Sequence, residues 1–190
     1  MIGKKNIVFG LFVFIFSAGV GPYMLIKQFP DLGKAQNSRK DTMNQLQKLS
    51  EEDFVDPQTK KEFTPVKLAI ELHKGLAAIN GEVIARSQIE QLRGGPHTHG
   101  NLESLLNIVI GLLLCFLAAP TLYKQLISWL FIAGTTLHAG MLYLAAYPPI
   151  ASAWAQTILG WGVGPIALLL GLLLTLVAAV LWLKPEVVRD

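Results

Sequence analysis

The sequence contains little charge and a single cysteine. Charged residues make up 15% of its 190 residues, and the formal net charge is +3. These charges are spread along the chain without a basic run, so the sequence offers no surface for nucleic acid. Cys115 alone excludes an intrachain disulfide and covalent CxxCH haem attachment. We interpret it as a small packing residue.

The common catalytic motifs are also missing. There is no nucleophile–base triad, no phosphate-binding glycine loop and no dinucleotide-binding fingerprint. Apolar residues are abundant instead, at 52% of the chain with a mean hydropathy of +0.46. This composition predicts a membrane protein.

Four apolar runs approach or exceed the 20 or so residues that a helix needs to cross a bilayer: 6–26, 102–120, 126–147 and 159–183. We therefore predict an all-α polytopic membrane protein, with four transmembrane helices and a helical extramembrane insertion between the first and second. Residues 1–28 hold the first transmembrane helix, 29–95 the insertion, and 96–190 a three-helix transmembrane region. The first run follows Lys4 and Lys5 and is longer than a usual signal core, which favours a retained anchor over a cleaved signal peptide.

The short flanks of the runs carry an uneven distribution of positive charge. Lys4 and Lys5 precede the first run, Lys124 lies between the second and third, and Lys184 and Arg189 follow the fourth. The positive-inside rule then places both termini in the cytoplasm. In a bacterium the chain would lie in the inner membrane, with residues 29–95 in the periplasm.

The outer segment shows helix signals interrupted by breaks. Thr64 followed by Pro65 indicates a helix start. Asn80-Gly81 predicts a break between two short amphipathic helices, and Gly94-Gly95 predicts the end of the second. Such helices are too small to form a hydrophobic core of their own. Their apolar faces would therefore pack on the membrane surface, on the ends of the transmembrane helices or on a neighbouring subunit. The segment is either a lid or a plain connector. His73 is expected at its surface.

Ionisable groups enter the start of the second apolar run. His99, Glu103 and Asn107 recur every four residues, so they form one stripe along a helix. His97 lies on roughly the opposite face, together with Asn101 and Ser104, and cannot share one ion with His99 on a regular helix. Since burying a carboxylate or an imidazole in hydrocarbon costs several kcal/mol unless it is paired, these residues are candidates for a functional site.

The third run adds Thr136, Gly140 and Tyr143 on one face and His138 near another. Three chemistries are open for this group. One or two imidazoles could ligate haem iron; histidines with a carboxylate could hold zinc, iron or copper; and Glu103 with His99 could relay protons. His138 also fits a structural role, bonded to a backbone carbonyl or a threonine.

Three segments carry a family resemblance: Leu-Glu-Ser-Leu-Leu-Asn-Ile-Val-Ile-Gly at 102–111, Gly-Met-Leu-Tyr-Leu at 140–144 and Gly-Val-Gly-Pro at 162–165. They resemble the styrene-oxide isomerase and hydroxylaminobenzene mutase family of small four-span bacterial membrane proteins. The resemblance implies a trimeric helical bundle that binds haem b through a second-span histidine. It also implies a redox-neutral isomerisation in which ferric iron acts as a Lewis acid. Asn107 and Tyr143 would position a small apolar substrate that enters from the lipid.

In this register Asn101 occupies the place of the family's haem-ligating histidine. His97 lies one turn earlier on the same face, so we expect it to be the axial metal ligand, with His99 next and His138 and Asn101 close to the cofactor. Glu103 joins Asn107 and Tyr143 as the expected catalytic group. The alternatives are a non-enzymatic membrane subunit and a proton or redox relay in a membrane complex.

Overall fold

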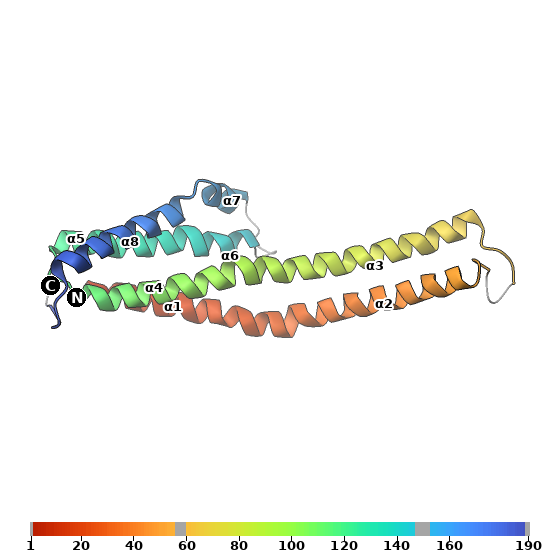
Figure 1. The fold of residues 1–190 in the computed structure, drawn as a ribbon, viewed down its shortest axis with the longest axis horizontal. Helices are drawn as coiled ribbons and strands as arrows, with labels where there is room; N and C mark the ends of the chain where they lie inside the picture. Colours follow the sequence, from red (N-terminus) through yellow and green to blue (C-terminus); the bar gives the residue numbers. More distant parts are fainter. Residues whose placement is uncertain (1, 56–59, 147–152, 189–190) are drawn as a thin grey trace. The chain divides into compact units, whose positions relative to one another are not determined.

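The computed structural model describes residues 2–55, 60–146 and 153–188, and it is 86% helix. No strand occurs within these ranges. The chain divides into two compact units, one formed by Met1–Pro22 with Gln91–Asp190 and the other by Tyr23–Glu90. The helices, drawn in Figure 1, are α1 (Gly3–Tyr23), η1 (Met24–Gln28), α2 (Phe29–Glu51), α3 (Pro65–Leu92), η2 (Arg93–His97), α4 (Thr98–Leu114), α5 (Thr121–Thr135), η3 (Thr136–Gly140), α6 (Met141–Ala146), α7 (Ala153–Gly160) and α8 (Val163–Trp182).

The first unit packs its long helices closely through small residues. A side chain at Gly10 of α1 would overlap the backbone of Ser104 in α4, and Gly3 lies against Gly111 in the same pair of helices. On the other side of the unit, Gly171 of α8 lies against the ring of Phe131 in α5. Close backbone approach of this kind is typical of helices that pack inside a membrane.

One end of the first unit gathers the start of α1, the end of α4, the start of α5 and the end of α8. Gly3 lies beside Gly111 and Cys115, while the amide of Ala118 donates to the carbonyl of Trp182 over 2.8 Å. α1, α4, α5 and α8 therefore run alternately away from and towards this end (Figure 1). The four elements expected from the apolar runs are all helical.

Three described helices are long and apolar enough to cross a membrane: Gly3–Glu51, Thr121–Ala146 and Val163–Trp182. α4, which contains most of the second apolar run, is not among them. It ends at Leu114, and six polar side chains occupy its first ten residues. The polar stripe that suggests a site thus also lowers the hydropathy of the helix that carries it.

One helix break expected from the sequence is wrong, and the other falls close to an observed helix end. α3 runs through Asn80-Gly81 as one helix of 28 residues and ends at Leu92, just before Gly94-Gly95. The backbone continues there as the π-helical segment η2, which contains Pro96 and leads into α4. A glycine inside a helix costs only about 1 kcal/mol relative to alanine, a penalty that packing overrides.

The structure also places two features of the apolar runs. Lys124, which lies between the second and third runs, belongs to the first turn of α5 and is 2% exposed. The fourth apolar run is not one helix from its start, because Gly162, with φ of 67°, separates α7 from α8. A left-handed backbone at that point ends the short helix and begins the long one. Tyr147, at the end of the third run, lies outside the described residues.

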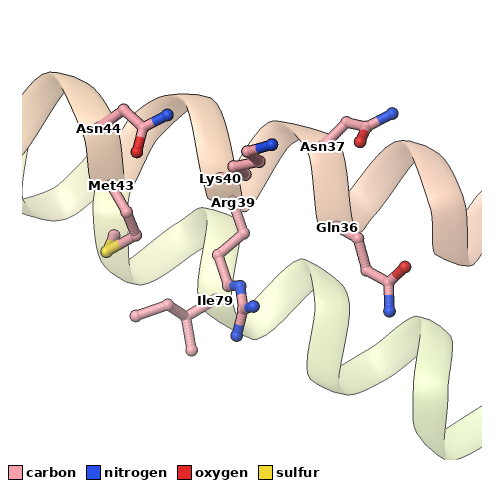
Figure 2. A pocket seen from close by; sticks show the side chains of 7 residues that line it. All are labelled: Gln36, Asn37, Arg39, Lys40, Met43, Asn44 and Ile79. Carbon is pink, nitrogen blue, oxygen red and sulfur yellow. The ribbon is translucent and has the colours of Figure 1, made fainter.

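The second unit is a hairpin of α2 and α3. Gly75 of α3 lies against the side chains of Met43 and Leu46 in α2, and the Arg39 guanidinium pairs with the Glu82 carboxylate at 2.8 Å. Figure 2 shows Arg39 and Met43 reaching from α2 towards α3 beside a shallow hollow. The predicted start of α3 is confirmed, since the Thr64 hydroxyl accepts a hydrogen bond from the amide of Lys67 at 3.3 Å.

Candidate metal centre

Two histidines and one carboxylate meet inside the first unit. His99 and Glu103 stand one turn apart on α4, and His138 comes from η3. The His138 Nδ1 atom lies 2.5 Å from Glu103 Oε1, the His99 Nδ1 atom lies 3.6 Å from the same oxygen, and the two imidazole rings are 4.6 Å apart. One donor atom from each residue falls within 4.8 Å of the other two.

Glu103 is almost completely buried, with 4% of its side chain exposed. Its Oε1 atom interacts with both histidines, whereas Oε2 is buried and lacks a hydrogen bond within normal distance limits from the described residues. The Thr135 side chain and the Ala139 backbone amide lie near the carboxyl group. An under-bonded carboxylate oxygen in an apolar helical unit is costly, and a cation would relieve the cost.

The distances suit a shared ion after a small adjustment. Nitrogen and oxygen ligands about 2.1 Å from a tetrahedral metal lie about 3.4 Å from each other. The His99–Glu103 distance of 3.6 Å is close to this value, and the His138–Glu103 distance of 2.5 Å is a short hydrogen bond. A metal at this place would take the position of the shared proton and move the two groups apart by roughly 1 Å.

η3 positions His138. It is a π-helical turn between α5 and α6, and such turns often occur at functional sites. Gly164 of α8 lies against the His138 backbone, where any side chain would collide with it. The imidazole is therefore held by a close helix contact behind it and by the Glu103 carboxylate in front. The sequence also allowed a structural role in which His138 bonds to a backbone carbonyl or a threonine. In the structure its partner is the Glu103 carboxylate instead.

A second polar group continues from Glu103 along α4. Asn107 donates to the Glu103 carbonyl at 3.0 Å and to the Thr135 hydroxyl at 2.9 Å, and its carbonyl oxygen accepts from Asn6 of α1 at 3.1 Å. The Ser128 hydroxyl in turn donates to the side chain of Asn6. All four side chains are buried. Both polar atoms of the Asn107 side chain are thus hydrogen-bonded to other protein groups. Because these bonds join α1, α4 and α5, we call Asn107 the clamp between the three helices.

His97 belongs to a separate group. Its Nδ1 atom lies 3.0 Å from the carbonyl oxygen of Ser17 in α1, and the Ser17 hydroxyl donates to the His97 carbonyl at 3.2 Å. The same hydroxyl accepts a hydrogen bond from Tyr143 of α6 at 2.7 Å. The residues expected to hold a cofactor therefore lie in different places. His99 and His138 meet at Glu103, whereas His97 lies beside Ser17. Asn101 has a buried Oδ1 atom that accepts no hydrogen bond from the described residues.

Asn6, Ser17 and Ser128 are absent from the residues that the sequence singles out. Asn6 directly follows two lysines and so resembles the polar flank of a span, and Ser17 belongs to a patch of small residues. Only the pairing of helices reveals their partners. A polar residue inside an apolar run was the available signal, because such residues bond to another helix by default.

An apolar hollow of about 260 Å³ lies within the same unit. Phe9, Phe12, Val13 and Phe16 of α1 line it on one side, and Thr135, Thr136, Gly140, Tyr143 and Leu144 line it on the other. Thr135 connects it to the polar group, since its hydroxyl binds Asn107. No known protein family, curated protein or solved structure matches this chain.

Proposed function

We propose that this chain is a four-span membrane protein that holds a divalent transition metal through His99, Glu103 and His138. The convergence of these three donors carries the proposal. They come from two helical elements, lie within 4.8 Å of one another and share a carboxylate that is buried among apolar helices. A hydrogen bond alone would satisfy one histidine, whereas a metal also uses the second histidine and the remaining carboxylate oxygen.

The four-span topology rests on the end of the first unit that gathers four helix termini. Lys4 and Lys5 lie at the start of α1, and the amide of Lys184 donates to the Phe116 carbonyl just after α4. Positive charges therefore collect at one end of the unit, which agrees with a cytoplasmic location for this end in a bacterial inner membrane. The α2–α3 hairpin then lies on the periplasmic side.

Two imidazoles and one carboxylate make up the donor set of non-haem iron(II) centres and of some catalytic zinc sites. Three protein ligands leave coordination positions open for a substrate or water. A metal in such a site polarises an oxygen atom of its substrate. The hollow beside Thr135 and Tyr143 suits a small apolar molecule that arrives from the lipid. A redox-neutral isomerisation of such a molecule is the reaction class we favour.

Haem b is the second candidate cofactor, and the environment of His97 favours it. A hydrogen bond from Nδ1 to a backbone carbonyl fixes the tautomer in which Nε2 is free to bind iron. The Ser17 carbonyl provides such a partner at 3.0 Å. His97 would then hold the haem, and Ser17 and Tyr143 would orient the imidazole and the adjacent backbone.

Metal analysis of the purified protein tests the first proposal. We expect one equivalent of iron or zinc per protomer in the wild type and a loss of at least tenfold in affinity in His138→Ala. The matched control is His73→Ala, because His73 is exposed on α3 and outside the cluster. Equal metal content in all three proteins would contradict the assignment.

An absorbance spectrum after haem-supplemented expression tests the second candidate. A Soret band that is lost in His97→Ala and kept in His73→Ala would support haem at His97. A colourless protein would contradict it. A protein that takes up neither metal nor haem would overturn both candidates, and the polar groups would then act as bonds between helices in a non-enzymatic membrane subunit.

A further inference from the structure

We propose that Thr135 is a positioning residue, which orients the Glu103 carboxylate for metal binding and whose role therefore rests on the proposed metal centre. Thr135 is the last residue of α5, and η3, which carries His138, begins at the next residue. Its side chain lies near the Glu103 carboxyl group, and the residue is 1% exposed. The same stretch of chain thus places Thr135 beside Glu103 and presents His138 to it.

The hydrogen bond between Asn107 and Thr135 has one possible direction. The Asn107 Nδ2 atom lies 2.9 Å from the Thr135 hydroxyl oxygen. The same nitrogen lies 3.0 Å from the Glu103 carbonyl oxygen and 3.5 Å from that of Phe131. Carbonyl oxygens only accept hydrogen bonds, so the nitrogen of the Asn107 amide, and not its oxygen, must face this side. The Thr135 hydroxyl therefore accepts from Asn107, and its own hydrogen points to another acceptor.

The usual acceptor within the helix does not take this hydrogen. A threonine hydroxyl inside a helix commonly donates to the carbonyl four residues earlier. Thr136 and Thr175 do so, at 2.8 and 2.7 Å. For Thr135 that carbonyl belongs to Phe131, where the Asn107 amide approaches instead. The hydrogen of the Thr135 hydroxyl is left for the carboxyl group beside it.

The clamp residue Asn107 is itself held in a fixed orientation. The Asn6 amide donates to the Asn107 Oδ1 atom and to the Ser128 carbonyl, both at 3.1 Å. The Ser128 hydroxyl donates to the Asn6 side chain. Side-chain hydrogen bonds thus run in one direction from Ser128 through Asn6 and Asn107 to Thr135. The last donor of this chain meets Glu103, and an ionised carboxylate, the form that binds a metal, is purely an acceptor.

A donor at this place limits the rotation of the Glu103 carboxylate. A carboxylate has two oxygens and about four lone pairs, so it can bind a metal and still accept a hydrogen bond. Its Oε1 atom faces His99 and His138, as a ligand shared with both histidines must. Outer donors keep ligating side chains in such an orientation, and their loss typically weakens metal binding by about 10- to 100-fold.

Cobalt titration of the purified full chain tests the role of Thr135. Thr135→Val loses the hydroxyl and keeps the shape of the side chain, whereas Thr135→Ser keeps the hydroxyl. We expect the Co²⁺ dissociation constant to rise about tenfold or more in Thr135→Val, with a changed visible band, and to stay within about threefold of wild type in Thr135→Ser. Thr175→Val is the matched control, because that buried hydroxyl bonds only within its own helix.

Ser128→Ala separates positioning from a general loss of stability. It removes the far end of the same hydrogen-bond chain without touching Glu103. We expect a lower midpoint of thermal unfolding for Ser128→Ala and a cobalt spectrum and affinity equal to wild type. A loss of cobalt binding as large as that of Thr135→Val would mean that loosened helices explain both, and would overturn the inference.

The remaining outcomes distinguish Thr135 from the metal centre itself. A wild type that binds cobalt, with a Thr135→Val variant of equal affinity and spectrum, would overturn the role of Thr135 and leave the centre in place. A wild type that binds no cobalt would overturn the centre and this role together. Circular dichroism checks that each variant is folded. Thr135→Ala loses the same hydroxyl and must give the same result, which keeps the test decisive if valine is not tolerated.

Discussion

Asn107 is the residue that ties three helices of the first unit together. It binds Asn6 of α1, Thr135 of α5 and the Glu103 carbonyl, and none of these groups has access to water. The hydrocarbon core of a membrane contains no water that could hydrogen-bond a polar group without a protein partner. The clamp therefore stabilises the same helix pairing that brings His138 to Glu103.

Replacement of Asn107 by leucine should destabilise the protein by about 1–2 kcal/mol, because it leaves Asn6 and Thr135 with fewer partners. The matched variant is Asn101→Leu, whose Oδ1 atom accepts no hydrogen bond from the described residues. We expect it to be close to neutral. Thermal unfolding in detergent measures both, and equal midpoints for the two variants would contradict the role given to Asn107.

Residue spacing predicts part of the candidate site. The four-residue period correctly places His99, Glu103 and Asn107 on one helix face, and helix geometry predicts the separation of His97 from His99. His138 is different, because its partner lies 35 residues away on another element. A pattern within one helix contains no information about which side chain of a second helix stands opposite.

At the scale of elements, small residues determine which helices meet. Gly10 and Gly111 allow α1 and α4 to touch along their backbones. Gly134 and Gly164 bring the backbones of α5 and η3 close to α8, and Gly171 leaves room for the Phe131 ring. In a bilayer, where lipid tails are as apolar as leucine, close packing replaces the hydrophobic effect as the main source of association. These contacts hold the helices that carry the histidines.

A leucine at Gly10 should separate α1 from α4, since its Cβ atom alone would lie 2.6 Å from the Ser104 carbonyl oxygen. We expect a loss of stability of about 2 kcal/mol or more from overpacking. Gly19 is the control, because a Cβ atom there meets nothing within 4 Å. Unfolding midpoints that respond equally to Gly10→Leu and Gly19→Leu would contradict this packing.

The apolar runs predict that the helices exist better than they predict where the helices begin and end. Sequence signals identify the start of α3 at Thr64 but wrongly break it at Asn80-Gly81, where the neighbouring α2 supports the helix through Arg39 and Glu82. Pro96 lies inside η2 and lacks the N–H that a regular helical hydrogen bond needs. For η3 the neighbouring feature belongs to another element, since Gly164 of α8 lies against the His138 backbone.

At the scale of the whole molecule, the proposed topology puts the end of α2 on the periplasmic side and the segment after α8 on the cytoplasmic side. It predicts that cysteines at these two places respond differently to a membrane-impermeant thiol reagent. In a Cys115→Ala background, Ser50→Cys at the end of α2 should be labelled from the periplasm in intact cells. Val188→Cys, beyond α8, should be labelled only after the membrane is opened. Labelling of both in intact cells would contradict the orientation.

A cobalt titration of the purified protein tests the proposed metal centre at His99, Glu103 and His138 most directly. Co²⁺ replaces zinc or iron(II) in nitrogen and oxygen sites and absorbs visible light when bound with low coordination number. We predict a visible band that saturates at one equivalent per protomer, survives His73→Ala and is abolished by both His138→Ala and Glu103→Gln. A wild-type spectrum identical to that of free cobalt, or one unchanged in His138→Ala, would contradict the claim.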